Sequence, residues 1–144
     1  MPVTDESVAA LRALLAGKSA EYERLYGNLD SAARRTGYPA MIDAAFFEAV
    51  DRRFGKGKAS DVVEFVGDIR SQSVTLEEQI DPRVAERLIQ AVLGDGSIDD
   101  IDDKARFSTE VILLAVLIAD EQLDSAGLDE VLDGARQLAD RWTS

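Results

Sequence analysis

A run of nine apolar residues at 111–119 constrains the fold of this chain more than any other feature of its sequence. The run is apolar on every side of a helix, which is typical of a central helix that its neighbours bury. A buried parallel strand would give a similar run, but no strand-turn-strand signal surrounds this one. Nine residues are also far fewer than the ~20 that cross a bilayer. We therefore expect a buried helix at about 104–121 and no membrane insertion.

The rest of the chain repeats the pattern of amphipathic helices. Apolar side chains recur at spacings of three and four residues, and a glycine or a polar capping residue separates one stretch from the next. No segment reads convincingly as a strand, and a length of 144 residues is usual for one domain. The sequence therefore predicts an all-α fold, a single-domain bundle over residues 1–144 with six or seven helices around the central one.

Local signals predict where the individual helices begin and end. Asp81 can cap a helix that starts at Pro82, and Gly94 can end it. Gly17 can end the first helix in the same way. The other predicted boundaries are Thr4 and Asp5 for the first helix, Ser19 and Gly37 for the second, Pro39 for the third, the capping boxes Asp61-x-x-Glu64 and Thr75-x-x-Glu78, and Ser125 for the last helix.

Cysteine and histidine are both absent, which excludes several classes of chemistry. Disulfides, thiolate nucleophiles, iron–sulfur clusters, thiolate zinc sites and histidine-based catalysis all need one or the other. A metal ion could be held only by oxygen ligands, which favours Ca²⁺ or Mg²⁺. Any catalysis would fall to Asp, Glu, Lys, Arg, Tyr or Ser. We therefore expect a protein that is not an enzyme and that has no cofactor beyond such an ion.

The basic residues and the first residues of the chain bear on its origin and location. Arginine outnumbers lysine by 12 to 4 and alanine is abundant, which is typical of GC-rich bacterial coding sequences. The first residues lack the basic and apolar regions of a signal peptide. We therefore expect a cytoplasmic bacterial protein.

Most of the net charge lies in one acidic segment, residues 95–133. The chain carries 28 acidic and 16 basic residues, a net charge of −12. The acidic segment holds twelve of the acids and two bases, so it accounts for ten of the twelve net negative charges. Acidity of this kind argues against binding to duplex nucleic acid, which needs a basic surface.

The acidic segment overlaps a repeat with an offset of 25 residues. Each copy contains an apolar run, a small residue, Asp, two further positions, Ile or Leu, and Asp, which pairs Asp95 with Asp99 and Asp120 with Asp124. These four carboxylates are the candidate ligands for Ca²⁺ or Mg²⁺. The first copy does not match an EF-hand loop, because apolar residues occupy two of the ligand positions. Helix capping and a solvated acidic face explain the same carboxylates without a metal.

The second copy, residues 119–128, resembles the acidic helix-turn-helix of TerB-like proteins, a helical family linked to tellurite resistance. The likeness covers about 25 residues, in which an apolar helix runs through an acidic turn into a second helix. Glu121 stands where the family has Gly, and Gly127 stands where it has an acid. The resemblance implies that Asp120 and Asp124 belong to an acidic surface that binds divalent cations.

A smaller basic segment, residues 34–58, has a net charge of +3 and could contact an acidic surface. Its loop at 54–58 could also contact phosphate through backbone amides and ammonium groups. A loop that follows a helix whose C-terminus favours cations is the simpler interpretation. The predicted contact residues are Arg52, Arg53, Lys56 and Lys58 on the basic side, and Asp102 and Asp103 on the acidic side.

Together these features predict a non-enzymatic protein that acts through protein–protein interaction. The acidic segment would be its contact surface, and a second copy of the chain, in a homodimer, would be one partner. The first alternative is a TerB-like module that binds divalent cations. A remote alternative is a carboxylate-dependent metalloenzyme on a helical bundle, although the Glu-x-x-His motifs of such bundles are absent.

Overall fold

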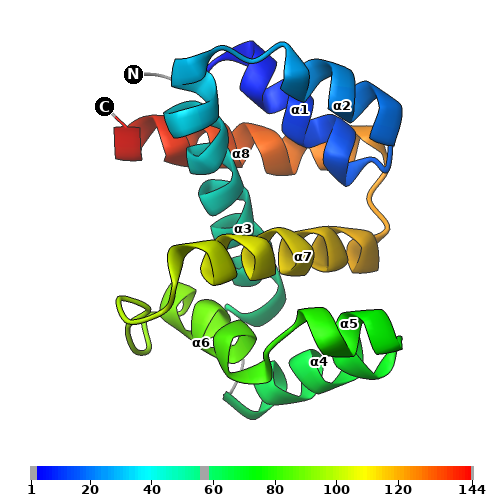
Figure 1. Cartoon of the computed structure of the whole chain (residues 1–144), viewed down its shortest axis with the longest axis vertical. Coiled ribbons are helices and arrows are strands. Elements are labelled where there is room, and N and C mark those ends of the chain that lie inside the picture. The colour runs from blue at the N-terminus through cyan, green and yellow to red at the C-terminus, as the bar shows by residue number, and fades with distance from the viewer. Residues whose placement is uncertain (1–2, 56–58, 144) are drawn as a thin grey trace. The chain divides into compact units, whose positions relative to one another are not determined.

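A computed structural model describes residues 3–55 and 59–143 of the chain. Those residues form eight α-helices and one π-helical turn, with no strand among them (Figure 1). The prediction of an all-α bundle is confirmed, with more helices than the six or seven expected. The elements are α1 (Asp5–Leu15), α2 (Ser19–Gly27), the π-helical turn η1 (Ala33–Gly37), α3 (Tyr38–Phe54), α4 (Ala59–Ser71), α5 (Val74–Gln79), α6 (Pro82–Val92), α7 (Asp103–Glu121) and α8 (Ser125–Thr143).

The chain divides into two compact units, which are described separately. Unit 1 comprises Met1–Glu48 and Ile118–Ser144, and unit 2 comprises Ala49–Leu117. The single domain over 1–144 stays a prediction. Among the described residues, none of the helices combines the length and the apolar character needed to cross a membrane.

In unit 1, polar contacts hold α1 antiparallel to α8. Arg12 donates to the Asp129 carboxylate at 2.6 Å, and Arg136 donates to the Asp5 carboxylate at 2.6 Å. The backbone N–H of Val3 donates to the Asp140 carboxylate at 2.7 Å. Residue numbers rise along one helix as they fall along the other, so the contacts fix the register of the pair. Each exposed ion pair adds at most ~1 kcal/mol to stability.

The second predicted helix is interrupted, and this corrects the expectation that it continues to Gly37. Helix α2 ends at Gly27, and the carboxylate of Asp30 then accepts the N–H of Ala33 at 2.8 Å to begin a new helix. This helix passes through η1 directly into α3, so Gly37 lies inside it. Pro39 explains the π-helical turn, because its ring clashes with the carbonyl four residues earlier in a regular α-helix.

Three tyrosines form a cluster in unit 1. The rings of Tyr26 and Tyr38 meet edge to face with centroids 5.2 Å apart, and the Tyr38 hydroxyl donates to that of Tyr22 at 3.3 Å. Arg34 lies over the Tyr26 ring, 5.3 Å from its centroid. Burial, followed by the hydrogen bond with Tyr22, raises the pKa of the Tyr38 hydroxyl well above its usual range. These contacts link α2 to the start of α3.

Several helix ends lie where the sequence predicts them. Thr4 accepts the N–H three residues ahead at 3.2 Å and caps α1, and Gly17 follows that helix with a φ of +75°. The Asp81 carboxylate accepts the N–H groups two and three residues ahead, at 2.9 and 3.3 Å, and Pro82 is the first residue of α6. Gly94 follows α6 with a φ of +87°. Both glycines hold left-handed conformations that other residues adopt only at a cost.

Other helix starts differ by one to three residues from the prediction. Lys18 occupies the N-cap position of α2, so Ser19 is its first helical residue. Helix α4 begins at Ala59, which places Asp61 in its first turn and not at its cap. The cap of α5 is Ser73, whose extended backbone lets its hydroxyl accept the N–H three residues ahead at 3.0 Å; Thr75 is already helical.

Helix α7 lies where the apolar run predicts a helix, but it is not buried on every side. Leu113, Leu114 and Leu117 are at most 2% exposed. Ala115 and Ala119 are exposed. Alanine counts as apolar in the sequence, yet it favours a helix equally on a buried and on a solvated face. The run therefore marks a helix with one buried face.

Candidate functional site

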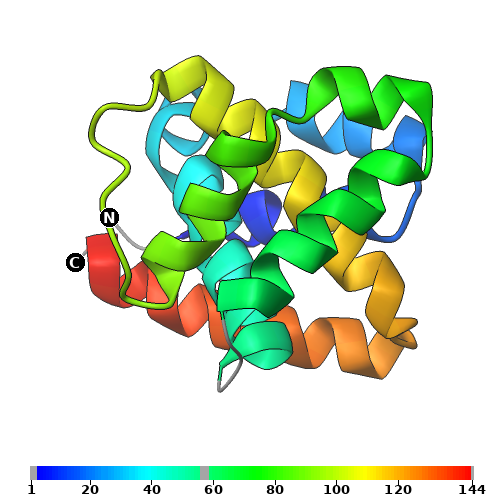
Figure 2. The ribbon, with the colours of Figure 1, turned by 90° about the horizontal axis from the view of Figure 1, so that it is seen from below.

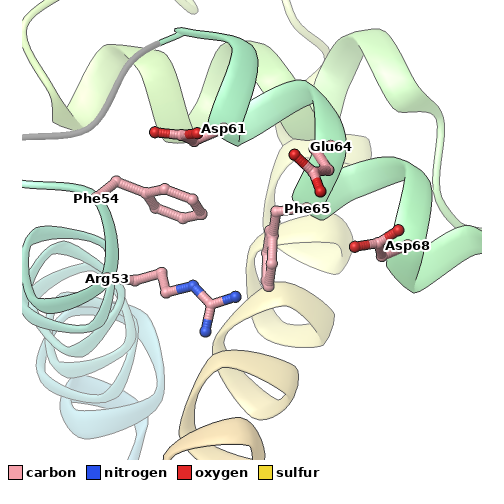
Figure 3. Close-up of a pocket in the computed structure, with 6 residues that line it drawn as sticks. All are labelled: Arg53, Phe54, Asp61, Glu64, Phe65 and Asp68. Carbon is pink, nitrogen blue, oxygen red and sulfur yellow. The ribbon is translucent and has the colours of Figure 1, made fainter.

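Unit 2 contains a hollow of about 280 Å³ beside the end of α3 and the outer face of α4. We call it the α3–α4 hollow. Arg53 and Phe54 come from the last turn of α3, and α4 supplies the remaining side chains (Figure 3). The residues that line it are Arg53, Phe54, Asp61, Glu64, Phe65 and Asp68.

The sequence of α4 explains why acidic side chains line the hollow. Val62, Val66 and Ile69 are at most 1% exposed and pack the helix against the rest of unit 2. The three acids, here called the α4 carboxylates, follow a spacing of three and then four residues, which aligns them on one side of a helix. With a rise of 1.5 Å per residue they extend over about 10.5 Å. They are Asp61, Glu64 and Asp68, and all are exposed.

Two aromatic rings and a guanidinium form the other part of the hollow. Phe54 and Phe65 meet edge to face with centroids 5.3 Å apart. The guanidinium carbon of Arg53 lies over both rings, 5.3 Å from the centroid of Phe65 and 6.0 Å from that of Phe54. Both distances suit a cation–π interaction. Phe54 and Phe65 are only 4% and 5% exposed as residues, whereas Arg53 is exposed.

The charges of the hollow favour a cationic group. Three carboxylates and one guanidinium line it, so its side chains carry two net negative charges. Figure 3 shows the α4 carboxylates along one side and the Arg53 guanidinium next to the Phe65 ring. Carboxylates bind ammonium and guanidinium groups through charge-assisted hydrogen bonds, and aromatic faces attract the same cations. The arrangement can therefore hold a positively charged side chain.

The predicted contact residues that the structure describes differ in their surroundings. Arg53 lines the hollow, whereas the neighbouring Arg52 is exposed and does not line it. Asp102 accepts the N–H of Ala105 at 3.0 Å and caps α7, and Asp103 is the first residue of that helix. The remaining two predicted residues, Lys56 and Lys58, and with them most of the predicted phosphate-binding loop, lie outside the described residues.

The predicted metal ligands belong to two separate turns. Asp95 and Asp99 lie in the loop between α6 and α7 of unit 2, whereas Asp120 and Asp124 lie at the turn between α7 and α8, in unit 1. Across residues 3–55 and 59–143, no group of three or more acidic side chains is placed to hold a metal ion. Asp124 instead accepts the N–H of Gly127 at 2.7 Å and caps α8. The metal site stays a prediction.

The loop between α6 and α7, residues 93–102, is here called the acidic loop, and it projects away from these two helices (Figure 2). An arginine of α6 binds it. Arg87 of α6 donates to both carboxylate oxygens of Asp100, at 3.0 and 2.5 Å, and to the carbonyl of Ser97 at 2.6 Å. The hydrogen bond from Arg87 lowers the pKa of Asp100. Part of the acidic segment therefore already has a basic partner within the chain.

Sequence reasoning missed the α4 carboxylates as a site, because Asp61 and Glu64 also match a capping box. The signal that would have found them is a further acid at helical spacing, Asp68, four residues after Glu64. The aromatic part of the hollow has no such signal in the sequence, because Phe54 and Phe65 belong to two different helices.

Comparison of the chain with family models, with curated proteins and with solved structures found no match. The TerB-like resemblance stays a prediction.

Proposed function

We propose that the protein is an interaction module and that the α3–α4 hollow binds a positively charged segment of a partner protein. The observation that carries this proposal is the lining of the hollow: three carboxylates in a row beside two phenylalanine rings that a guanidinium covers. The proposal keeps the expected mode of action, protein–protein interaction, and moves the contact surface from the acidic segment to α4.

The α4 carboxylates repel one another, which supports a cationic ligand. Asp61 and Glu64 are three residues apart, and Glu64 and Asp68 are four apart, so each pair shares one side of the helix. Like charges at these spacings destabilise a helix by about 0.2–0.5 kcal/mol per pair. A bound cation would relieve both repulsions, so part of the binding free energy comes from the helix itself.

The acidic segment at 95–133 supports a contact surface less well. Arg87 pairs with Asp100, Arg12 pairs with Asp129, and Asp102 and Asp124 cap α7 and α8. A partner would have to compete with these contacts. Glu64 and Asp68 lie along a hollow with room for a side chain.

Binding of a basic peptide tests the proposal. The probe is a fluorescein-labelled peptide of Gly and Ser with three arginines at alternate positions, which in an extended chain lie about 6.6 Å apart. Fluorescence anisotropy with the full chain should show binding that the double variant Glu64→Gln/Asp68→Asn weakens severalfold, by up to about thirtyfold, because two exposed charge pairs contribute up to ~1 kcal/mol each.

A matched control separates the hollow from the general acidity of the chain. Glu77→Gln/Glu78→Gln on α5 removes the same charge from the same unit, and both side chains are exposed. We expect this control to change the affinity by less than about twofold. Equal weakening by the two double variants would show nonspecific attraction and refute the proposal. Sedimentation of the unlabelled chain tests the other occupant, since self-association that the α4 variant abolishes would identify a second copy.

A further inference from the structure

We propose that the hollow recognises arginine in preference to lysine, and that Arg53 occupies the place of the partner's arginine until the partner binds. The inference rests on the proposed function and names the side chain that the hollow takes. Its basis is that the chain already places one guanidinium over the two aromatic rings of the hollow.

The position of Arg53 is that of an internal ligand. Its guanidinium carbon lies 5.3 Å from the centroid of the Phe65 ring, and Phe65 is 5% exposed as a residue. An incoming cation therefore competes with Arg53 for this ring. Arg53 is on the last turn of α3 and is exposed, so its long side chain can leave by rotation about its own bonds.

The chemistry of the hollow distinguishes the two basic side chains. A guanidinium is planar, stacks on an aromatic face and donates two parallel hydrogen bonds to one carboxylate, whereas an ammonium is a compact and strongly hydrated charge. The hollow offers both an aromatic face and carboxylates within one lining. A partner's arginine therefore replaces every contact that Arg53 gives up, whereas a lysine is attracted to the rings and carboxylates without planar stacking or paired hydrogen bonds.

Removal of Arg53 tests the inference with two peptides. The probes are the arginine peptide described above and the same peptide with lysine at the three positions. Arg53→Gln should tighten binding of the arginine peptide about threefold or more, because the peptide no longer competes with the Arg53 guanidinium for the two rings. The lysine peptide should gain less, so the ratio of the two affinities should rise.

Arg52→Gln is the matched control, because it removes the same charge from the adjacent position outside the lining of the hollow. It should tighten binding by less than about twofold. Equal gains for the two variants, or weaker binding with Arg53→Gln, would overturn the inference. Peptides that bind wild type and the α4 double variant equally would instead refute the proposed function.

An NMR measurement on wild type also tests the inference, and it needs no variant. In wild type, the Nε–Hε NMR signal of Arg53 should carry a ring-current shift from the two phenylalanines. The arginine peptide should move this signal toward the position of a solvated arginine, as Arg53 leaves the rings. A signal that stays in place while the peptide saturates the protein would overturn the inference.

Discussion

Replacement of Asp124 by alanine should lower the free energy of unfolding, because this residue begins α8. Its carboxylate accepts the N–H of Gly127 at 2.7 Å, and that N–H has no acceptor within the helix. Loss of an N-cap costs about 1 kcal/mol, within a range of ~0.5–2 kcal/mol. For a chain of this size the melting temperature should fall by about 3 °C.

Two further variants show which side chain forms the cap. Asp124→Asn keeps an acceptor in the same place and should lose only a few tenths of a kcal/mol, chiefly through the charge near the helix N-terminus. Ser125→Ala removes the residue that the sequence predicts as the cap; its hydroxyl accepts instead from Arg12 at 2.6 Å. That exposed contact should be worth less than about 0.5 kcal/mol. Urea denaturation followed by circular dichroism at 222 nm measures all three variants.

The same variants separate capping from metal binding at Asp124. A site for Ca²⁺ or Mg²⁺ would stabilise wild type by ~1.4 kcal/mol at about ten times the dissociation constant of the ion, and Asp124→Ala would abolish that gain. Capping predicts the same loss with and without millimolar ion. An unchanged free energy of unfolding for Asp124→Ala, or a larger loss for Ser125→Ala, would refute the capping argument.

On α7, Leu114→Ala should cost about 2–5 kcal/mol because the side chain is fully buried, whereas Ala115→Gln on the exposed face should change stability by less than about 0.5 kcal/mol. Similar urea midpoints for both would contradict one-sided burial. Arg87→Gln should speed amide hydrogen exchange in the acidic loop. Arg87 lowers the pKa of Asp100, so the pair stabilises the loop fully at pH values above the ordinary Asp pKa of about 3.9. This stabilisation is lost as the pH falls through the lowered pKa, and the NMR shift of the Asp100 carboxyl carbon can follow the titration. The raised pKa of Tyr38 stabilises the fold below the ordinary value of about 10 and ceases to do so at higher pH. Absorbance at 295 nm should therefore show equal amplitudes up to about pH 11 for wild type and Tyr38→Phe; a smaller amplitude for the variant would contradict a raised pKa.

Local signals predicted those parts of the fold that local physics decides. Asp81 with Pro82 begins α6, and Gly17 and Gly94 follow helices in the left-handed conformation that glycine permits. These outcomes depend on a few neighbouring residues, so the sequence alone is sufficient. The exposure of Ala115 depends on which side of α7 meets other helices, and composition does not determine that.

The sequence does not predict the break between α2 and α3, for a different reason. The apolar spacing continues past Gly27, and Gly37 reads as a helix end. In the structure the carboxylate of Asp30 starts a new helix, and the π-helical turn before Pro39 lets that helix continue. The sequence therefore offers two different helix boundaries in this region, an end at Gly37 and a start at Asp30, and the contacts of unit 1 decide between them.

The sequence singles out only one residue of the hollow. It predicts Arg53 as a basic contact residue for an acidic surface, and in the structure Arg53 lies over two phenylalanine rings. The ring contact between Phe54 and Phe65 joins the end of one helix to the middle of the next. No pattern within either helix encodes that contact, because it follows from how the two helices cross.

The positions of the acids within their helices show which of them helix chemistry explains. The acidic segment contains the starts of α7 and α8, where carboxylates cap N–H groups and oppose the helix dipole favourably. That benefit fades within the first turn. Glu64 is the sixth residue of α4, and Asp68 lies in its last turn, where a negative charge is unfavourable. Helix chemistry therefore accounts for Asp102, Asp103 and Asp124, but not for Asp120 and Glu121 in the last turn of α7. It does not account for Glu64 and Asp68 of α4 either, and a cation bound beside these two would relieve the repulsion between them.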